Sequence, residues 1–158
     1  MGKAKWFCAK TGLPTIADDG GMEINILHGW PGVHSRRIFG DGRRATDEDL
    51  MSEVLRRLQG VSPEQRGAQM RTVVAFAASD GTTCSGDGVD RGMITERASD
   101  HRIPGFPFRS IFYHLAYGMV VSEAASGTGN DVMTHRRDAV VKILPGISHW
   151  IDSQALIA

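Results

Sequence analysis

The stretch IADDGGMEINILHGWPGVHSRR, residues 16–37, constrains this chain more than any other part of its sequence. Two adjacent carboxylates, Asp18 and Asp19, end a short apolar run, and Gly20 and Gly21 follow them directly. Glycine has no Cβ, so it lets a backbone approach a ligand closely. Carboxylate oxygens hold divalent cations, and substrate phosphates can complete the coordination shell. The stretch therefore indicates a metal-dependent site for a phosphorylated substrate.

The two carboxylates can share a ligand only if the chain turns between them and the next run. Successive side chains of a strand point to opposite faces of a sheet. We therefore expect strands over residues 15–17 and 22–27, with a turn at Gly20 and Gly21. The alternative is an ordinary Asp-Asp-Gly-Gly surface turn without a ligand, and the spacing alone leaves both open.

The composition fits an ordinary globular protein. The chain has 158 residues, which suits one domain with its own core. Its formal net charge is zero, which argues against a nucleic-acid polymer as the main partner. No apolar run approaches the length of a membrane span. Cys8 and Cys84 do not form a C-x-x-C pair, so we expect two reduced thiols in a cytoplasmic protein.

Helix and strand patterns alternate along the chain. The clearest helix covers residues 46–58, where Thr46 can cap its start. Residues 70–78 predict a buried strand, and Asp80-Gly81 predicts a hairpin turn after it. We expect a single α/β domain over residues 1–158, with a curved mixed sheet and flanking helices.

The last predicted helix covers residues 134–144. Its apolar residues are expected to face the core, namely Ala139, Val140, Ile143 and Leu144. Pro145 is expected to end it, because proline breaks helices. The preceding residues 118–131 are rich in Gly, Ser and Ala and predict a mobile loop.

Four ordered motifs resemble the inosine triphosphate pyrophosphatase family. The family carries A-D-D-S-G-L, P-G-(V/I)-x-S-(A)-R, G-F-G-Y-D-P-(I/L)-F and S-H-R, and the matching segments here are residues 17–22, 31–36, 105–112 and 134–136. That family hydrolyses non-standard purine nucleoside triphosphates (ITP, dITP, XTP) to a monophosphate and pyrophosphate. The resemblance implies an elongated sheet with a nucleotide cleft between two lobes, and Mg²⁺ or Mn²⁺ as the metal.

The resemblance also assigns roles around the acidic pair. Asp18 matches a metal-site residue, and Asp19 matches the general base that activates the attacking water, beside the metal. Gly20 stands where the family has Ser, near the phosphates, so a hydroxyl is missing there. Ser35-Arg36 could face a phosphate, and a solvated loop is the alternative.

His135 and Arg136 follow Thr134, a predicted N-cap, so both should lie in the first turn of a helix. Cations there oppose the helix dipole at a cost of about 0.3–1 kcal/mol each. A bound anion would remove that conflict. The alternative is a pair of solvated side chains. By resemblance, the pair contacts the nucleotide, including the purine 6-oxo group.

Phe106 and Phe108 offer aromatic faces on which a purine could stack. The alternative is core packing of a strand over residues 106–113, and the resemblance favours Phe106 for stacking. Arg109 stands where the family has Asp, which helps to fix the base. Asn130 stands where the family has a phosphate-binding Lys, so phosphate affinity should fall.

The family's opening strand, T/S-G-N-x-x-K loop and helix have no counterpart in this sequence. The expected fold is therefore shortened at its N-terminus, either by truncation or as a natural short form. We favour a degenerate relative that binds dITP or ITP and signals to a partner protein, with antiviral or stress defence as a conjectured setting.

Two other functions stay open. One is an active Mg²⁺-dependent pyrophosphatase, and the other is a fragment without a ligand. We expect a homodimer or a complex with a second protein, and neither a nucleic-acid polymer nor a membrane as partner.

Overall fold

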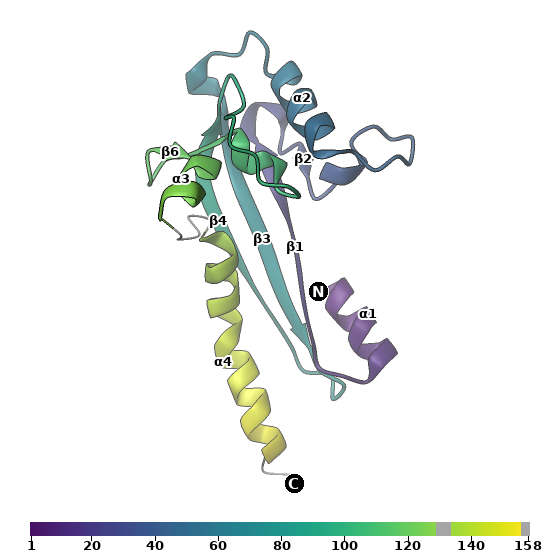
Figure 1. Ribbon diagram of the computed structural model, residues 1–158. Coiled ribbons are helices and arrows are strands. Elements are labelled where there is room, and N and C mark those ends of the chain that lie inside the picture. Colours follow the sequence, from purple (N-terminus) through teal and green to yellow (C-terminus); the bar gives the residue numbers. More distant parts are fainter. Residues whose placement is uncertain (129–133, 156–158) are drawn as a thin grey trace. The chain divides into compact units, whose positions relative to one another are not determined.

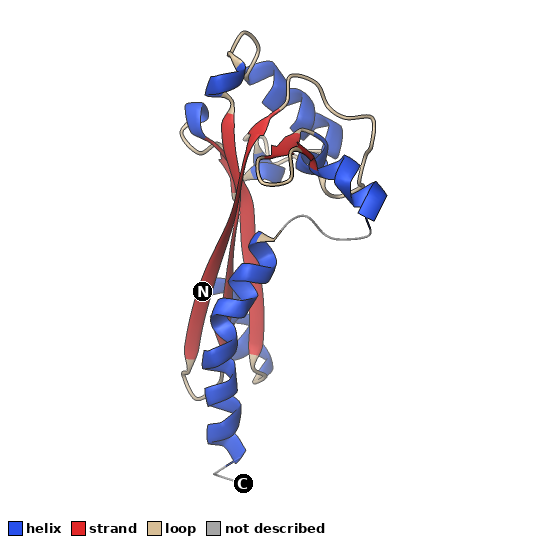
Figure 2. Ribbon diagram, turned by 90° about the vertical axis from the view of Figure 1, so that its left-hand side faces the viewer, coloured by secondary structure: helices blue, strands red, loops and turns tan. Residues whose placement is uncertain are grey.

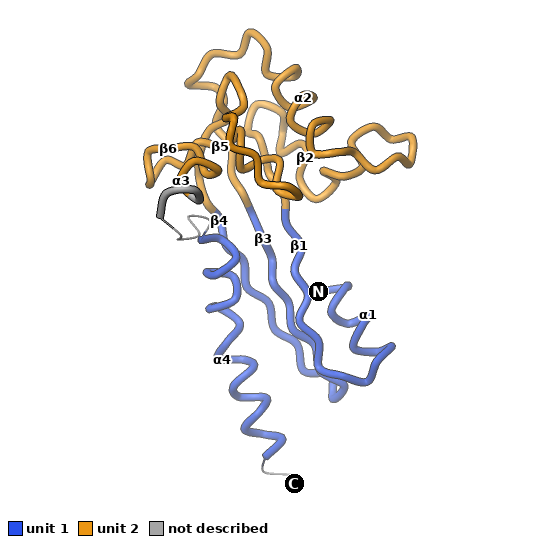
Figure 3. Tube along the Cα trace, in the orientation of Figure 1, with its two compact units in different colours: residues 1–20, 71–89, 134–158 blue, residues 21–70, 90–133 orange. Residues whose placement is uncertain are grey.

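The computed structural model describes residues 1–128 and 134–155 of the chain (Figure 1). The chain divides into two compact units, which Figure 3 draws in different colours. Unit 1 comprises residues 1–20, 71–89 and 134–158, and unit 2 comprises residues 21–70 and 90–133. The expectation of one domain over residues 1–158 stays a prediction, because several strands belong to both units.

A six-stranded sheet has the strand order β2-β1-β3-β4-β5-β6. Its strands are β1 (Thr15–Ile24), β2 (Pro31–Gly32), β3 (Gly67–Ala77), β4 (Thr83–Ile94), β5 (Phe112–His114) and β6 (Met119–Val120). The pairs β1–β2, β4–β5 and β5–β6 are antiparallel. Strands β1, β3 and β4 cross the boundary between the units in alternating directions. The predicted α/β class is confirmed, and the sheet is antiparallel rather than mixed because neighbouring strands run in alternating directions.

Unit 1 has two small cores on opposite faces of its strands. Helix α1 (Gly2–Thr11) contributes to a core made of Ala4, Cys8, Ala75 and Ala77. Helix α4 (His135–Ala155) contributes to a core made of Val74, Phe76, Ala78, Ala139 and Ile143. Adjacent residues of β3 alternate between these cores, as the pleat of a strand requires. Figures 1 and 2 show the two helices on opposite faces of these strands.

Unit 2 has one larger core. Helices α2 (Asp47–Arg57) and α3 (Val121–Thr128) cover the parts of β1, β3 and β4 that belong to this unit. The buried residues are Met22, Ile24, Met51, Val54, Leu58, Ala68, Met70, Ile94, Ile111, Phe112, Val121 and Ala124. The short 3-10 helices of this unit are η1 (Asn25–Leu27), η2 (Ser35–Arg37), η3 (Pro63–Gln65) and η4 (Pro107–Ser110).

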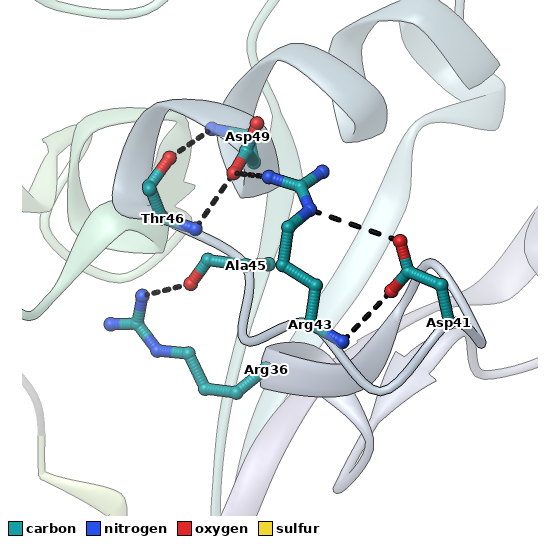
Figure 4. A network of polar contacts seen from close by, with 6 residues as sticks. All are labelled: Arg36, Asp41, Arg43, Ala45, Thr46 and Asp49. Carbon is teal, nitrogen blue, oxygen red and sulfur yellow. Dashed lines mark hydrogen bonds and ion pairs between the residues drawn. The ribbon is translucent and has the colours of Figure 1, made fainter.

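Helix α2 begins as the sequence predicts. The Thr46 hydroxyl accepts a hydrogen bond from the Asp49 amide at 3.1 Å, and the Asp49 carboxylate accepts one from the Thr46 amide at 2.9 Å (Figure 4). This reciprocal capping box satisfies two amides that the helix itself leaves unpaired. Arg43 donates to the same carboxylate at 3.0 Å, which further fixes the start of the helix.

Strand β1 runs without interruption through residues 18–21, so the predicted turn between two strands is wrong. A Cβ on Gly20 would collide with the Arg71 carbonyl oxygen, and one on Gly21 would collide with the Gly32 carbonyl oxygen. The two glycines therefore allow close approach to neighbouring strands. They do not form a turn.

Helix α4 continues ten residues beyond its predicted end at Pro145, to Ala155. The later turns are held because Ile147 and Trp150 pack on the core of Val74 and Phe76. The Trp150 indole also donates to the Asp80 carboxylate at 2.8 Å. These tertiary contacts outweigh the break that proline introduces locally.

The prediction that four apolar residues of α4 face inward is half right. Ala139 and Ile143 are buried, at 0% and 1% exposed. Val140 and Leu144 are 39% and 48% exposed, so the prediction is wrong for them. Residues four apart share one face of a helix, and only the face of Ala139 and Ile143 meets β3.

Residues 119–128, expected within a mobile loop, form β6 and α3. Val121 and Ala124 are buried in the core of unit 2, which explains why a Gly-, Ser- and Ala-rich segment is helical. Cys8 and Cys84 are free thiols, as expected. Within residues 1–128 and 134–155, no helix is both long enough and apolar enough to span a membrane.

Candidate functional site

Four charged side chains of unit 1 gather around β1. The Lys3 ammonium lies 3.6 Å from a carboxylate oxygen of Asp19 and donates to the Asp18 carbonyl oxygen at 2.9 Å. The Arg136 guanidinium lies 3.4 Å from the Asp18 carboxylate. All four side chains are about half exposed, between 48% and 64%. We call Lys3, Asp18, Asp19 and Arg136 the charged cluster.

The two carboxylates of the charged cluster point to opposite faces of β1. Asp19 pairs with Lys3 of α1, whereas Asp18 pairs with Arg136 of α4, and these helices cover opposite faces of the strands. The predicted turn would have brought both carboxylates to one ligand. In the continuous strand, they cannot jointly hold one ion.

A metal ion fits this cluster only together with a phosphate. Mg²⁺ is commonly held by one or two carboxylates plus substrate phosphate oxygens and water. Asp18 or Asp19 can each provide one such carboxylate. Among the described residues, no group of three or more His, Cys, Asp or Glu side chains could hold a metal by itself. The donor set therefore suits an ion that arrives with a phosphorylated ligand.

His135 and Arg136 lie in the first turn of α4, as predicted. The start of this helix packs tightly on β4, because a Cβ on Gly88 would collide with the His135 carbonyl oxygen. His135 is buried and only 8% exposed, whereas the Arg136 side chain is 58% exposed. The alternative of two solvated side chains is therefore wrong for His135.

Gly20 and Asn130 are two other residues that the resemblance places near the phosphates. Gly20 leaves no room for a side chain beside Thr72, so the hydroxyl of the family's Ser could not be accommodated here without a shift of the strands. Asn130 lies outside the described residues. Its predicted contact with phosphate stays a prediction.

The aromatic residues of the predicted base site lie in unit 2. Pro107 opens η4, where its fixed φ favours a helical turn, so the predicted strand over residues 106–113 is wrong before residue 112. Phe106 is 45% exposed, and the Arg109 guanidinium lies over its ring at 4.6 Å from the centroid. Phe108 packs against the core of unit 2, as the core-packing alternative predicted.

Arg36 is bound within unit 2 and is not a solvated loop residue. Its guanidinium lies 2.6 Å from the Asp47 carboxylate and donates to the carbonyl oxygens of Ala45 and Gly105, each at 3.2 Å. The Ser35 hydroxyl donates to the Gly32 carbonyl oxygen at 2.8 Å. Sequence analysis missed Asp47 as the partner of Arg36, because an acid in the first turn of a helix already has a local explanation.

Lys3 is a second residue that sequence analysis missed. Its ammonium contacts both residues of the acidic pair. One signal was available, because Lys3, Lys5 and Lys10 come before any acidic residue of the chain. A helix so rich in unpaired cations predicts an acidic or phosphorylated neighbour.

The model of the Ham1 family matches residues 1–145. This chain belongs to the Ham1 family. A dITP/XTP pyrophosphatase of Desulfotalea psychrophila is 33% identical over 147 residues, which cover 90% of this chain and 62% of the relative. A dITP/XTP pyrophosphatase of Shouchella clausii is 33% identical over 141 residues, with 89% and 69% covered. The chain thus spans less than two thirds of the Desulfotalea relative and somewhat more of the other.

Solved structures of the family share the fold. The Ham1 protein of Staphylococcus aureus has a TM-score of 0.75 at 24% identity, with 93% of this chain and 73% of that chain covered. A nucleoside-triphosphatase / dITP/XTP pyrophosphatase from Mycobacterium abscessus has a TM-score of 0.71 at 28% identity, with 90% and 73% covered. The resemblance inferred from the four motifs is confirmed at the level of family and fold.

Proposed function

We propose that this chain binds a deaminated purine nucleoside triphosphate, dITP or ITP, and signals its presence to a partner protein in the cytoplasm. The observation that carries the proposal is the charged cluster of unit 1. Its two cations and two carboxylates are half exposed and weakly paired. Such groups can exchange their present partners for a ligand at little cost.

The triphosphate meets the charged cluster in this proposal. Its ion pairs of 3.4 and 3.6 Å are longer than the roughly 2.7–2.9 Å of a strong charge-assisted hydrogen bond. Lys3, on the face of β1 where Asp19 lies, can therefore turn to a phosphate oxygen. Asp18 or Asp19, each on its own face of β1, can then provide the carboxylate that holds Mg²⁺ or Mn²⁺ together with those phosphates.

The base is recognised by His135, Arg136 and Phe106. Donors from the first two meet the 6-oxo group, and the exposed ring of Phe106 stacks on the purine. Arg109 supplies a donor where the family has an acceptor. A 6-amino group would present a donor to these donors, at a cost of about 1–3 kcal/mol. We therefore expect dITP to bind about tenfold to a hundredfold more tightly than dATP.

A protein partner is supported by apolar surface on unit 1. Val140, Leu144 and Ile151 of α4 are 39%, 48% and 54% exposed. In the described part of the chain, β2 is the strand beyond β1 and pairs only with Met22 and Glu23, so residues 15–20 form an open sheet edge. Open edges and apolar patches bind other chains. A second copy or a second protein can fill this place, and antiviral or stress defence is the setting that we propose.

Hydrolysis is the second possible function, and Asp19 favours it. Its carboxylate is 64% exposed at the position of the family's general base. Asp19 would take a proton from water as the water oxygen bonds to the α-phosphorus. The bond from that phosphorus to the bridging oxygen then breaks, and pyrophosphate leaves. A bound metal would neutralise the developing charge.

Calorimetry with dITP and dATP, each with and without Mg²⁺, tests the binding proposal. Asp19→Asn should weaken the metal-dependent part of dITP binding, and His135→Ala should reduce the preference for dITP over dATP. Asp152→Asn, an exposed carboxylate of α4 outside the charged cluster, is the matched control and should change neither. Equal affinities for dITP and dATP in the parent protein would contradict the proposal.

A pyrophosphate-release assay and a size measurement on the same protein separate the two functions. The signalling role predicts little or no turnover and a dimer or complex. A stable monomer that turns over dITP at about 10 s⁻¹, the typical rate of an enzyme, would establish the pyrophosphatase instead.

A further inference from the structure

We infer that the ion pair of Arg36 and Asp47 is a positioning device for the loop that carries Phe106, and that it sets base discrimination without contacting the nucleotide. The inference rests on the proposed function for the role of Phe106. We call the closed set of contacts among Arg36, Asp47 and Gly105 the Gly105 clamp.

The clamp holds both polar backbone groups of one residue. The Gly105 amide donates to one carboxylate oxygen of Asp47 at 2.6 Å, and the Gly105 carbonyl accepts from Arg36 at 3.2 Å. The other carboxylate oxygen of Asp47 lies 2.6 Å from the same guanidinium. Three residues far apart in the sequence thus form a closed ring of contacts. Phe106 is the next residue along the chain.

The clamp is anchored on the start of α2. Asp47 is the first residue of this helix and lies between Thr46 and Asp49, the two residues of the capping box that Figure 4 draws. Arg36 additionally donates to the Ala45 carbonyl oxygen at 3.2 Å, also drawn in Figure 4. The side chains of Arg36 and Asp47 are only 30% and 31% exposed, so water screens their pairing less than that of a surface pair.

Gly105 is the third residue of a tight turn that runs from Ile103 to Phe106. Its φ of +84° lies in the left-handed region, which glycine adopts readily and other residues rarely do. The Phe106 amide closes the turn by donating to the Ile103 carbonyl at 2.9 Å, and the Arg109 amide donates to the Phe106 carbonyl at 3.1 Å. The clamp holds this turn from outside, at the residue directly before Phe106. The backbone position from which the Phe106 ring projects therefore depends on the clamp.

Stacking of an aromatic ring on a purine depends on how the ring is oriented, whereas the attraction between a cation and a phosphate depends far less on orientation. A ring that is held within about 0.5 Å of its productive position recognises a base far better than a mobile one. In the proposed function, the phosphate chain meets Lys3, which is not part of the clamp. Loss of the clamp should therefore weaken base discrimination and leave affinity for the phosphate chain unchanged.

The test compares Asp47→Ala with Glu48→Ala. Each removes one carboxylate from the first turn of α2, so each loses the same interaction with the helix dipole. Asp47 accepts the hydrogen bond from the Gly105 amide. Glu48 instead lies 3.6 Å from Arg102, and its side chain is 71% exposed. We expect Asp47→Ala to bind dITP about tenfold more weakly and to lose most of its preference over dATP. Affinity for inorganic tripolyphosphate with Mg²⁺ should stay within about twofold.

Two further variants keep the inference testable if Asp47→Ala folds poorly. Asp47→Asn keeps an acceptor for the Gly105 amide but loses the ion pair, so a smaller loss of discrimination is expected. Arg36→Met should reproduce the loss from the other side, and combining it with Asp47→Asn should add little more. Glu48→Ala should bind dITP and tripolyphosphate with the same affinities as the parent protein.

Hydrogen exchange of the Gly105 and Phe106 amides gives a readout that does not depend on nucleotide binding. Exchange should be faster in Asp47→Ala and unchanged in Glu48→Ala. If the parent protein does not bind dITP, the proposed function fails, and this readout still decides whether the clamp fixes the loop. Unchanged exchange, or equal losses for dITP and tripolyphosphate, would overturn the inference.

Discussion

The charged cluster of unit 1 and the Gly105 clamp of unit 2 are held in opposite ways. In unit 1, Lys3 and Arg136 lie 3.6 and 3.4 Å from their carboxylates, and the side chains are about half exposed. In unit 2, the contacts of Arg36 with Asp47 and of Asp47 with Gly105 are both 2.6 Å, and these side chains are about one-third exposed. The ion pairs of the charged cluster are long and solvent-exposed, whereas the contacts of the Gly105 clamp are short and close on one another.

This difference separates residues that can bind from residues that hold the fold. Exposed and loosely paired charges contribute little to stability, typically about 0–1 kcal/mol. Shorter, less exposed networks contribute more, and their loss leaves polar groups without partners. The charged cluster of unit 1 therefore stays available to a ligand, whereas the Gly105 clamp of unit 2 fixes a backbone.

The largest effect is expected at Arg66, a cation of unit 2 that is only 4% exposed. Its guanidinium donates to the carbonyl oxygens of Leu58, Ile94 and Thr95 at 2.7–2.8 Å. Arg66→Met leaves these buried acceptors without a donor and should lower the free energy of unfolding by about 3 kcal/mol or more. Urea unfolding measures this. Arg66→Lys, which has one nitrogen, should lie in between, and a loss below about 1 kcal/mol would weaken the contrast between the units.

The next largest effect tests whether the backbone of unit 1 is tightly packed, although the ion pairs of its charged cluster are long and exposed. Gly88→Ala places a Cβ against the His135 carbonyl, so α4 must shift. Overpacking of this kind costs about 1–3 kcal/mol. Gly2→Ala in α1, where a Cβ meets nothing within 4 Å, is the control and should be neutral or slightly stabilising. Thermal unfolding of both variants would show whether the backbone of unit 1 is packed tightly.

A smaller effect is expected at Glu53 of α2. Hydrogen bonds from Arg56, and then from Arg57, lower the pKa of Glu53 from 4.5 to about 2. Because the folded pKa is depressed, this stabilisation is present above about pH 4.5 and is lost as the pH falls toward 2. Glu53→Gln should lower stability by about 0.5–1 kcal/mol at pH 7. The difference from the parent protein should shrink between pH 4.5 and 2, and a constant difference would contradict it.

The smallest effect on stability is expected in the charged cluster. Asp18→Asn and Asp19→Asn each break one long, half-exposed ion pair, so the free energy of unfolding should change by less than about 0.5 kcal/mol. The same variants should weaken Mg²⁺-dependent binding of dITP. A change above 1 kcal/mol in urea unfolding would show that these carboxylates hold the fold, as the charges of unit 2 do.

Local signals in the sequence predicted local structure well. Thr46 caps the start of α2 as predicted, with Asp49 as its partner in the capping box. Gly81 lies in the hairpin turn with a φ of +90°. Each of these features depends on residues within a few positions of one another. Neighbouring residues alone can therefore specify them.

Features that depend on distant neighbours were not predicted. Gly20 and Gly21 indicated a turn, yet they are needed because Arg71 and Gly32 lie close beside them. Pro145 indicated the end of a helix, yet contacts of Trp150 with Phe76 and Asp80 hold the helix beyond it. The partners of Arg36 could not be predicted either, because Gly105 lies 69 residues away.

The division of the chain also has a genetic consequence. Unit 1 is assembled from residues 1–20, 71–89 and 134–158, and the two stretches of unit 2 lie between them. Neither unit corresponds to an uninterrupted part of the reading frame. Recombination with a single crossover cannot transfer one unit and leave the other behind. A single crossover also cannot transfer the whole charged cluster, residues 3 to 136, without the loop that carries Phe106. A deletion of residues 1–20 or 71–89 would cut strands that continue into unit 2.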